Sequence, residues 1–358
     1  MKSRLRGASQ RQMAVRLRSL IGGFRRVRLA VVGDLVADEF IYGQLDRVSR
    51  EAPVLILKYD STEIVPGGAG NAANNAAALG AQVQVVGIVG RDGAGTRMID
   101  TLGQRADVRS VLRPAGYVTP TKTRILAGGV HSVKQQVVRI DRAGGRLAPA
   151  AARAIEASLV NALRKASAII LSDYGSGLVT SDMWQRALSA ARLTKAPIAL
   201  VDSRYALTTF SSITACTPNE AELEAIVGER IGEDVDRLEA AGRSLLKTLG
   251  CRAVLVTRGS RGMALFEPGQ RTDHIPIVGS DQVTDVTGAG DTVIATFTLA
   301  VAAGATFAEA ARLANYAGGL VVMKRGTATV SADELTAAIE GAATRRIAQT
   351  KSNGRGRN

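Results

Sequence analysis

The sequence predicts an α/β protein with a doubly wound, mostly parallel sheet, helices on both faces and a small β-sheet lid. Short apolar runs typical of buried strands alternate along the chain with helical stretches. Two segments, 39–64 and 118–141, break this rhythm with the alternating polarity of hairpin strands, and we expect them to form the lid. The chain has 358 residues, of which 46% are hydrophobic, so it can bury a large core.

Each remaining element follows from its local pattern. Strands are expected where short apolar runs are bounded by turn residues, and helices where longer stretches repeat every three to four residues. Because strands and helices alternate, consecutive strands are expected to lie parallel, with helices between them. The predicted strands are 29–32, 83–89, 168–171, 198–201 and 253–257, and the predicted helices are 71–79, 96–104, 150–165, 181–193 and 234–249.

We expect three parts along the chain. Residues 1–27 form a basic extension with a short amphipathic helix over 13–24, residues 28–340 form the main domain, and residues 341–358 form a basic flexible tail. The uncharged run 292–308 is 17 residues long and contains polar residues. It therefore suits a buried helix better than a membrane span.

The charge distribution does not favour nucleic-acid binding. The formal net charge is +14, but nine Lys/Arg lie within 1–28 and five within 341–358, where there are no acids, so the rest of the chain is neutral. Binding a phosphate backbone needs a broad positive face, and base stacking needs aromatic side chains, which make up only 4% of the residues. We expect neither nucleic acid nor a membrane as a partner.

Cysteine and histidine usage excludes two further classes of protein. Cys216 and Cys251 are too few for a disulfide framework, and His131 and His274 are too far apart for a zinc motif. No secretory signal is visible. We expect a reduced protein of the cytoplasm.

The strongest candidate site is the run Asp285-Val-Thr-Gly-Ala-Gly-Asp291, which precedes an apolar helical stretch. Gly288, Ala289 and Gly290 would place successive N–H groups at a helix N-terminus, which is an anion site. Asp291 would lie in the first helical turn and could accept a hydroxyl proton there. The alternative is structural: the glycines permit a tight turn, and Asp291 complements the helix dipole.

Two more segments belong to the same hypothesis. Gly67, Gly68 and Asn71 precede a small-residue helix, where the backbone can approach a ligand and the Asn71 amide can read a hydroxyl. Asp34 follows the first predicted strand and is placed to hold ligand hydroxyls. Both segments also have a purely structural interpretation: Gly67, Gly68 and Asn71 as the start of a helix, and Asp34 as a turn residue.

The run Thr217-Pro-Asn-Glu-Ala-Glu222 combines structural and functional signals. We predict a capping box between Thr217 and Glu220, which makes Glu220 structural. Asn219 and Glu222 share a helix face and could hold the water shell of a magnesium ion. Thr257, Gly259 and Gly262 follow a strand and could line a nucleotide, although a plain β-turn fits that segment nearly as well. The P-loop and G-x-G-x-x-G motifs are absent.

Together, and in this order, these motifs resemble those of the ribokinase-like (PfkB) carbohydrate kinases, over roughly residues 28–335. Within that family the chain is most similar to the D-glycero-D-manno-heptose 7-phosphate kinases of ADP-heptose synthesis. The runs that carry this second resemblance are Gly33-Asp34 with Asp38 and Gly43, RVSREAPV at 47–54, TKTR at 121–124, QQVVRID at 135–141 and SDY at 172–174.

The resemblance implies a ribokinase-like fold and ATP-dependent phosphorylation of the heptose 7-phosphate at O1, giving the 1,7-bisphosphate. It implies ATP and magnesium, with potassium as a further candidate, and a homodimer joined through the lid. The implied roles are Asp291 as the catalytic base; Gly288, Ala289 and Gly290 as the anion hole; Asp34, Gly67, Gly68 and Asn71 for the sugar; Lys122, Arg124 and Arg139 for its phosphate; Asn219, Glu222, Thr257, Gly259, Gly262, Asp285 and Thr287 for the nucleotide; and Asn219 and Glu222, through water, for the metal.

The chain departs from the heptose kinases at two positions. Ser176 stands where they usually carry a lysine, and Asp202-Ser-Arg204 replaces their usual Asp-Pro-Lys, so Arg204 keeps a cation and Ser176 does not. The alternatives are another PfkB kinase, acting on ribose, a fructose phosphate or a nucleoside, and a non-catalytic sugar-binding protein. A nucleotidyltransferase is disfavoured because no H-x-G-H run occurs.

Overall fold

The computed structural model describes residues 2–129, 134–278, 285–324 and 326–355. The strands of its large sheet are β1 (Arg28–Gly33), β4 (Gln82–Ile88), β5 (Asp107–Leu112), β8 (Ala168–Asp173), β9 (Ile198–Ser203), β10 (Ala215–Cys216), β11 (Ala253–Thr257), β12 (Met263–Phe266) and β13 (Asp273–Ile275). Their order is β13-β12-β11-β10-β9-β8-β1-β4-β5. Pairs from β5 to β11 are parallel, and β12 and β13 add antiparallel partners at one edge. The mostly parallel sheet is confirmed.

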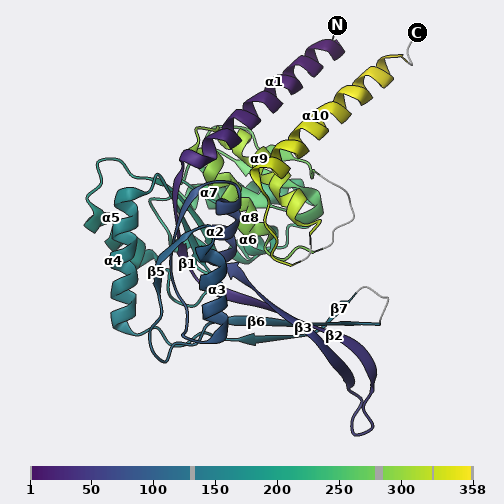
Figure 1. Cartoon of the computed structure of the whole chain (residues 1–358). Helices are drawn as coiled ribbons and strands as arrows, with labels where there is room; N and C mark the ends of the chain where they lie inside the picture. The colour runs from purple at the N-terminus through teal and green to yellow at the C-terminus, as the bar shows by residue number, and fades with distance from the viewer. Residues whose placement is uncertain (1, 130–133, 279–284, 325, 356–358) are drawn as a thin grey trace.

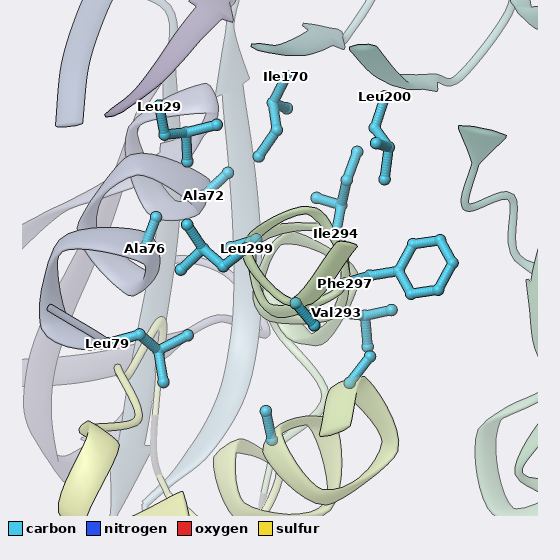
Figure 2. Close-up of a cluster of buried hydrophobic side chains, with 14 of the residues drawn as sticks. Leu29, Ala72, Ala76, Leu79, Ile170, Leu200, Val293, Ile294, Phe297 and Leu299 are labelled. Carbon is cyan, nitrogen blue, oxygen red and sulfur yellow. The ribbon is translucent and has the colours of Figure 1, made fainter. Parts of the chain in front are cut away.

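Helices cover both faces of this sheet, as predicted. They are α2 (Ala69–Ala78), α3 (Gly93–Gly103), α4 (Pro149–Lys165), α5 (Ser181–Ala191), α6 (Glu220–Val227), α7 (Val235–Leu249), α8 (Ala289–Ala302) and α9 (Phe307–Val321). Side chains of β1 alternate between two buried clusters: Leu29 and Val31 face α2, α8 and α9, whereas Ala30 and Val32 face α4, α5 and α7. Figure 2 shows strand residues on the first face pointing toward α2 and α8. The sheet is buried on both sides, which explains its near-continuous apolar runs.

The uncharged run becomes α8 and the start of α9, and α8 is buried along most of its length. It packs between α2 and α9 and against the sheet (Figure 2). No helix in the described part of the chain is both long and apolar enough to cross a membrane.

The lid is a second sheet, in the order β3-β2-β6-β7. Its strands are β2 (Leu35–Val48), β3 (Leu55–Gly68), β6 (Thr121–Gly128) and β7 (Gln135–Arg142). It projects from the body (Figure 1). Residues 130–133 of the second predicted segment lie outside the described residues. Several large apolar side chains of the lid are exposed: Leu45, Val48, Leu55, Tyr59, Val138 and Ile140. The predicted lid is confirmed.

The two basic ends form helices that lie side by side and extend from the body (Figure 1). These helices are α1 (Lys2–Gly23) and α10 (Ala332–Arg355). Arg18 of α1 pairs with Glu340 of α10 at 2.9 Å. Residues 341–355, where we expected a flexible tail, continue α10 as far as Arg355. The last three residues lie outside the described part.

Candidate active site

The predicted site residues gather at the carboxyl ends of the parallel strands, where α/β sheets bind ligands. Asp34 follows β1, Asp173 ends β8 and Asp202 lies near the end of β9. Asp34 N–H donates to the Ser172 carbonyl of β8 at 3.0 Å, which joins two strand ends. The N-terminus of α8 lies at the same edge of the sheet. Its Asp291 accepts hydrogen bonds from Asn71, which follows β3, and from Tyr174, which follows β8.

Asp291 is almost completely buried, with 3% of its surface exposed. Its Oδ2 accepts from Asn71 Nδ2 at 2.9 Å, and its Oδ1 accepts from the Tyr174 hydroxyl at 2.9 Å. Burial raises the pKa of this carboxyl to about 7, and the two hydrogen bonds oppose the rise. A group that is half ionised near neutral pH and fixed in place is suited to accept a proton.

Asn71 holds the turn before α8 as well as Asp291. Its Nδ2 also donates to the Gly288 carbonyl at 3.2 Å, and its Oδ1 accepts from Asn75 at 3.0 Å. Gly288 has φ 76°, and a Cβ there would lie 2.3 Å from Asn71 Nδ2, so both conformation and space require glycine. We predicted that the Asn71 amide reads a sugar hydroxyl. That contact stays a prediction: in this structure both Nδ2 donors are engaged and orient Asp291, while Oδ1, which can accept two hydrogen bonds, accepts one from Asn75.

The predicted anion hole is the first turn of α8. Ala289 N–H donates to the Val286 carbonyl at 3.2 Å, so one of the three expected donors is engaged. The N–H groups of Gly290 and Asp291 lie where a helix end leaves its amides pointing outward. Asp285 accepts from the N–H groups of Thr287 and Gly326, at 2.9 and 3.0 Å, so it ties this turn to the loop after α9.

Asp34 is held by the loop that follows β8. Its Oδ2 accepts from the N–H groups of Tyr174, at 2.8 Å, and Ser176, at 3.2 Å, and its Oδ1 accepts from the Ser176 hydroxyl. Burial raises the pKa of Asp34 against these bonds. Gly68 has φ 56°, and a Cβ there would lie 2.7 Å from the Asp34 carbonyl and 3.4 Å from the Tyr174 ring. Gly68 therefore allows two strand ends and the ring to meet.

Tyr174 is the main site residue that sequence reasoning missed. It contacts Asp291, Asp34 and the Gly68 backbone, although only its place in the run SDY marked it. Two cations lie against its ring: Lys122 Nζ is 5.1 Å and Arg204 Cζ 5.0 Å from the centroid. Burial, followed by the nearby Arg204, lowers the pKa of Lys122.

The lid places the three cations predicted to bind phosphate at neighbouring positions of β6 and β7, where Arg124 pairs with Arg139 and Lys122 pairs with Asp141 in the strand register. Arg124 donates to Asp38 at 2.6 Å, in a largely buried pair, and Gly67 lies beside the same carboxylate. Arg139 pairs with Asp141 at 2.7 Å near the surface. Of the three, only Lys122 has no carboxylate partner within 4.0 Å among the described residues. In this structure, Arg124 and Arg139 are bound to acids of the lid itself.

Arg47 and Arg50, in the run at 47–54, lie far from Asp34 within one chain. Arg47 lies twelve residues beyond Leu35 along β2, which is ~40 Å for an extended strand. Both arginines therefore lie at the tip of the β2–β3 hairpin, away from the body (Figure 1).

The predicted capping box is displaced by two residues. Asn219 caps α6: its Oδ1 accepts from Glu222 N–H at 2.9 Å, and Glu222 Oε2 accepts from Asn219 N–H at 2.9 Å. Asparagine is a better N-cap than threonine, so Asn219, and not Thr217, caps this helix. Glu220 instead pairs with Arg258, at 2.6 Å, and with Arg261. Glu220 is structural as predicted, but through ion pairs with the segment after β11.

Glu222 nevertheless faces the site. It lies close enough to Asp202 for its charge, after burial, to raise the pKa of that carboxyl well above its ordinary value. Burial also raises the pKa of Glu222. Two partly desolvated carboxylates that repel each other fit a magnesium ion held through water. Thr257 forms a β-bridge with Asn219. A short helical turn follows Thr257, beginning at Gly259 and capped by Gly262.

Comparisons with known proteins agree with this geometry. The chain is 38% identical to the Bifunctional protein HldE of Geobacter sulfurreducens over 323 residues, and 40% identical to that of Nitrosococcus oceani over 324. Each match covers 90% of this chain, and the chain spans 64% and 66% of those relatives, less than two thirds of their length.

Two solved structures share the fold across 88% of this chain and 99% of theirs. They are Arabidopsis thaliana ribokinase complexed with ribose and ATP (TM-score 0.69, 22% identity) and Escherichia coli phosphofructokinase-2 in complex with fructose-6-phosphate (0.70, 20%). At these identities they show the fold, which is ribokinase-like as expected. The pattern of the pfkB family carbohydrate kinases matches residues 28–334. The chain therefore belongs to the pfkB family of carbohydrate kinases.

Proposed function

We propose that this carbohydrate kinase transfers the γ-phosphoryl group of ATP to O1 of D-glycero-D-manno-heptose 7-phosphate. The observation that carries the reaction type is Asp291, a buried carboxyl with a pKa of about 7 at a helix N-terminus. The heptose is supported by the runs at 47–54, 121–124, 135–141 and 172–174, and by the similarity to proteins named Bifunctional protein HldE.

In this proposal Asp291 accepts the proton of the attacking sugar hydroxyl. The sugar oxygen bonds to the γ-phosphorus, while the bond to the bridging oxygen of ADP breaks. The outward N–H groups of Gly290 and Asp291 stabilise the charge on the moving group. Asn71 keeps the base oriented. General-base assistance of this kind is worth about 10²–10⁴ in rate.

Glu222, with Asp202 beside it, is proposed to hold magnesium through water next to the ATP phosphates. Bound there, the ion would neutralise charge on the phosphates. Asn219, Thr257, Gly259 and Gly262 are proposed to line the nucleotide. Asp285 and Thr287 support the turn against which its phosphates would lie. Potassium is a further candidate ion.

The sugar phosphate is proposed to bind Lys122 and Arg204. Neither has a carboxylate partner within 4.0 Å among the described residues, and both lie about 5 Å from the Tyr174 ring centroid. Arg204 occupies the position where the heptose kinases usually carry lysine, so it preserves the cation. Asp34 is proposed to bind sugar hydroxyls.

The lid is proposed to join two copies of the chain. Its exposed apolar residues, which include Tyr59 with 70% of its surface exposed, would be covered by the same face of a second lid. The arginines at the hairpin tip would then lie near the partner subunit. Light scattering at micromolar concentration tests this, since a particle of 37.4 kDa is a monomer and contradicts the proposal.

The activity itself is tested by measuring ADP release with heptose 7-phosphate, fructose 6-phosphate, fructose 1-phosphate, ribose and adenosine as acceptors. We expect the highest kcat/KM for the heptose phosphate, and a loss of turnover of at least about 10² in Asp291→Asn. A higher kcat/KM for another sugar would support the alternative within the family. Phosphorylation of none would support a sugar-binding protein.

A further inference from the structure

One short loop donates hydrogen bonds to two carboxylates of the site. The Tyr174 hydroxyl donates to Asp291 Oδ1 at 2.9 Å. The Tyr174 and Ser176 N–H groups and the Ser176 hydroxyl donate to Asp34. Sugar hydroxyls are proposed to bind these same carboxylates, so the loop occupies acceptor positions that the sugar would use.

We propose that the Tyr174 hydroxyl stays hydrogen-bonded to Asp291 until a sugar hydroxyl replaces it. While it is bonded there, Asp291 does not accept a proton from water, so ATP is not hydrolysed when sugar is absent. We call this role of Tyr174 the guard. Tyr174 is then a positioning residue that suppresses a side reaction. This inference rests on the proposed kinase function and deepens it.

The contacts indicate that the phenol, and not the amide, gives way when sugar binds. Asn71 is fully buried in α2, and Asn75 fixes its Oδ1. Tyr174 is half-buried and precedes the exposed residues 175–177, two of which are glycines. With Asp291 only 3% exposed, a sugar hydroxyl reaches Oδ1 once the phenol moves.

The side reaction would be hydrolysis of ATP. A water oxygen would attack the γ-phosphorus, its proton would pass to Asp291, and the bond to the bridging oxygen would break to release ADP. A phenol bonded to Oδ1 takes the position at which that water would donate. Burial and the nearby Asp291 raise the pKa of Tyr174 well above its ordinary value, so its hydroxyl stays a donor at working pH.

The first test compares Tyr174→Phe with Tyr205→Phe in magnesium-ATP without sugar. The first variant keeps the ring between its neighbours and removes the hydroxyl. Tyr205 is a matched control because it lies on the adjoining loop, is 77% exposed and makes no hydrogen bond in the described structure. Measured well above pH 7, where Asp291 is ionised in both proteins, ADP release should rise about fivefold in Tyr174→Phe, the worth of one net hydrogen bond, and should not change in Tyr205→Phe. Unchanged release in Tyr174→Phe overturns the proposal.

The second test separates a guard from a residue that stays bonded during turnover. The pH profile of kcat/KM for the sugar reports the enzyme before sugar binds, whereas that of kcat reports the complex. Because the phenol bond lowers the pKa of Asp291, its loss should move the acid limb of kcat/KM to higher pH and leave the limb of kcat in place. A shift of both limbs, or of neither, contradicts the guard.

These outcomes are distinct from failure of the proposed function. If the wild-type protein phosphorylates none of the sugars, the kinase proposal fails. If it phosphorylates one of them, but Tyr174→Phe leaves sugar-free ADP release unchanged, only the guard fails. Ser176→Ala gives an independent variant, since it removes one of the loop's bonds to Asp34 and should raise sugar-free ADP release in the same direction.

Discussion

Replacing Asp291 by asparagine is expected to stabilise the fold while it abolishes phosphoryl transfer. The side chain is buried, and its pKa rises from the ordinary 3.8 to about 7. Between these values the folded protein binds a proton that the unfolded chain has lost, so stability falls as pH rises through that window. Above pH 7 the full cost of holding the charge is present.

The magnitude follows from the shift. At 1.36 kcal/mol for each pKa unit, holding Asp291 ionised costs about 4 kcal/mol above pH 7. About half of that cost is already present at pH 5.5. Asparagine keeps the size and carries no charge, so its advantage over aspartate should grow by about 2 kcal/mol between pH 5.5 and 8.5.

Urea unfolding of both proteins at the two pH values measures this difference. Asp182→Asn is the control, because Asp182 also lies in the first turn of a helix, α5, but is exposed. The helix-dipole reading of Asp291 makes the opposite prediction, a loss of about 0.3–1 kcal/mol on removing the charge. An Asp291→Asn protein that is less stable at pH 8.5 would refute the reasoning from burial.

Three further predictions follow from the site. For the wild-type protein, kcat/KM for the sugar should rise with pH through about 7 and then level off, because Asp291 must be ionised; a flat profile from pH 5 to 8 would contradict this. Glu222→Gln should raise the magnesium concentration needed for half-maximal rate, whereas Glu220→Gln should lower the free energy of unfolding by about 1–3 kcal/mol through its arginine partners; the reverse pattern would show that the two roles are exchanged. Arg204→Ala should raise KM for a phosphorylated sugar at least about tenfold and spare KM for ATP, while Arg139→Ala, which is paired at the surface, should change neither; equal effects on both substrates would exclude a phosphate site at Arg204.

The fold was predictable because its signals are local. Apolar runs such as 168–171 are buried on both faces of a parallel sheet, and their alternation with helices determines the architecture. The turn before Asp291 was predictable for a similar reason, since Gly288 adopts a conformation that few other residues accept.

The structure differs from the predictions where distant segments decide between local options. Thr217 and Glu220 fit a capping box in sequence, but arginines from beyond β11 bind Glu220, and Asn219 caps the helix instead. The C-terminal segment looked flexible by itself, yet α10 continues along α1. Tyr174 could not be identified from spacing, because its partners Asp291 and Asp34 lie more than a hundred residues away on either side.

Asp291 is proposed to be the catalytic base of a sugar-phosphate kinase. The most direct measurement is the rate of formation of heptose 1,7-bisphosphate from ATP and heptose 7-phosphate, for the wild-type protein and for Asp291→Asn, with binding of both substrates measured in parallel. We expect the variant to bind ATP and the sugar phosphate as the wild type does and to lose turnover by at least about 10². Turnover within a few fold of the wild type would contradict the claim.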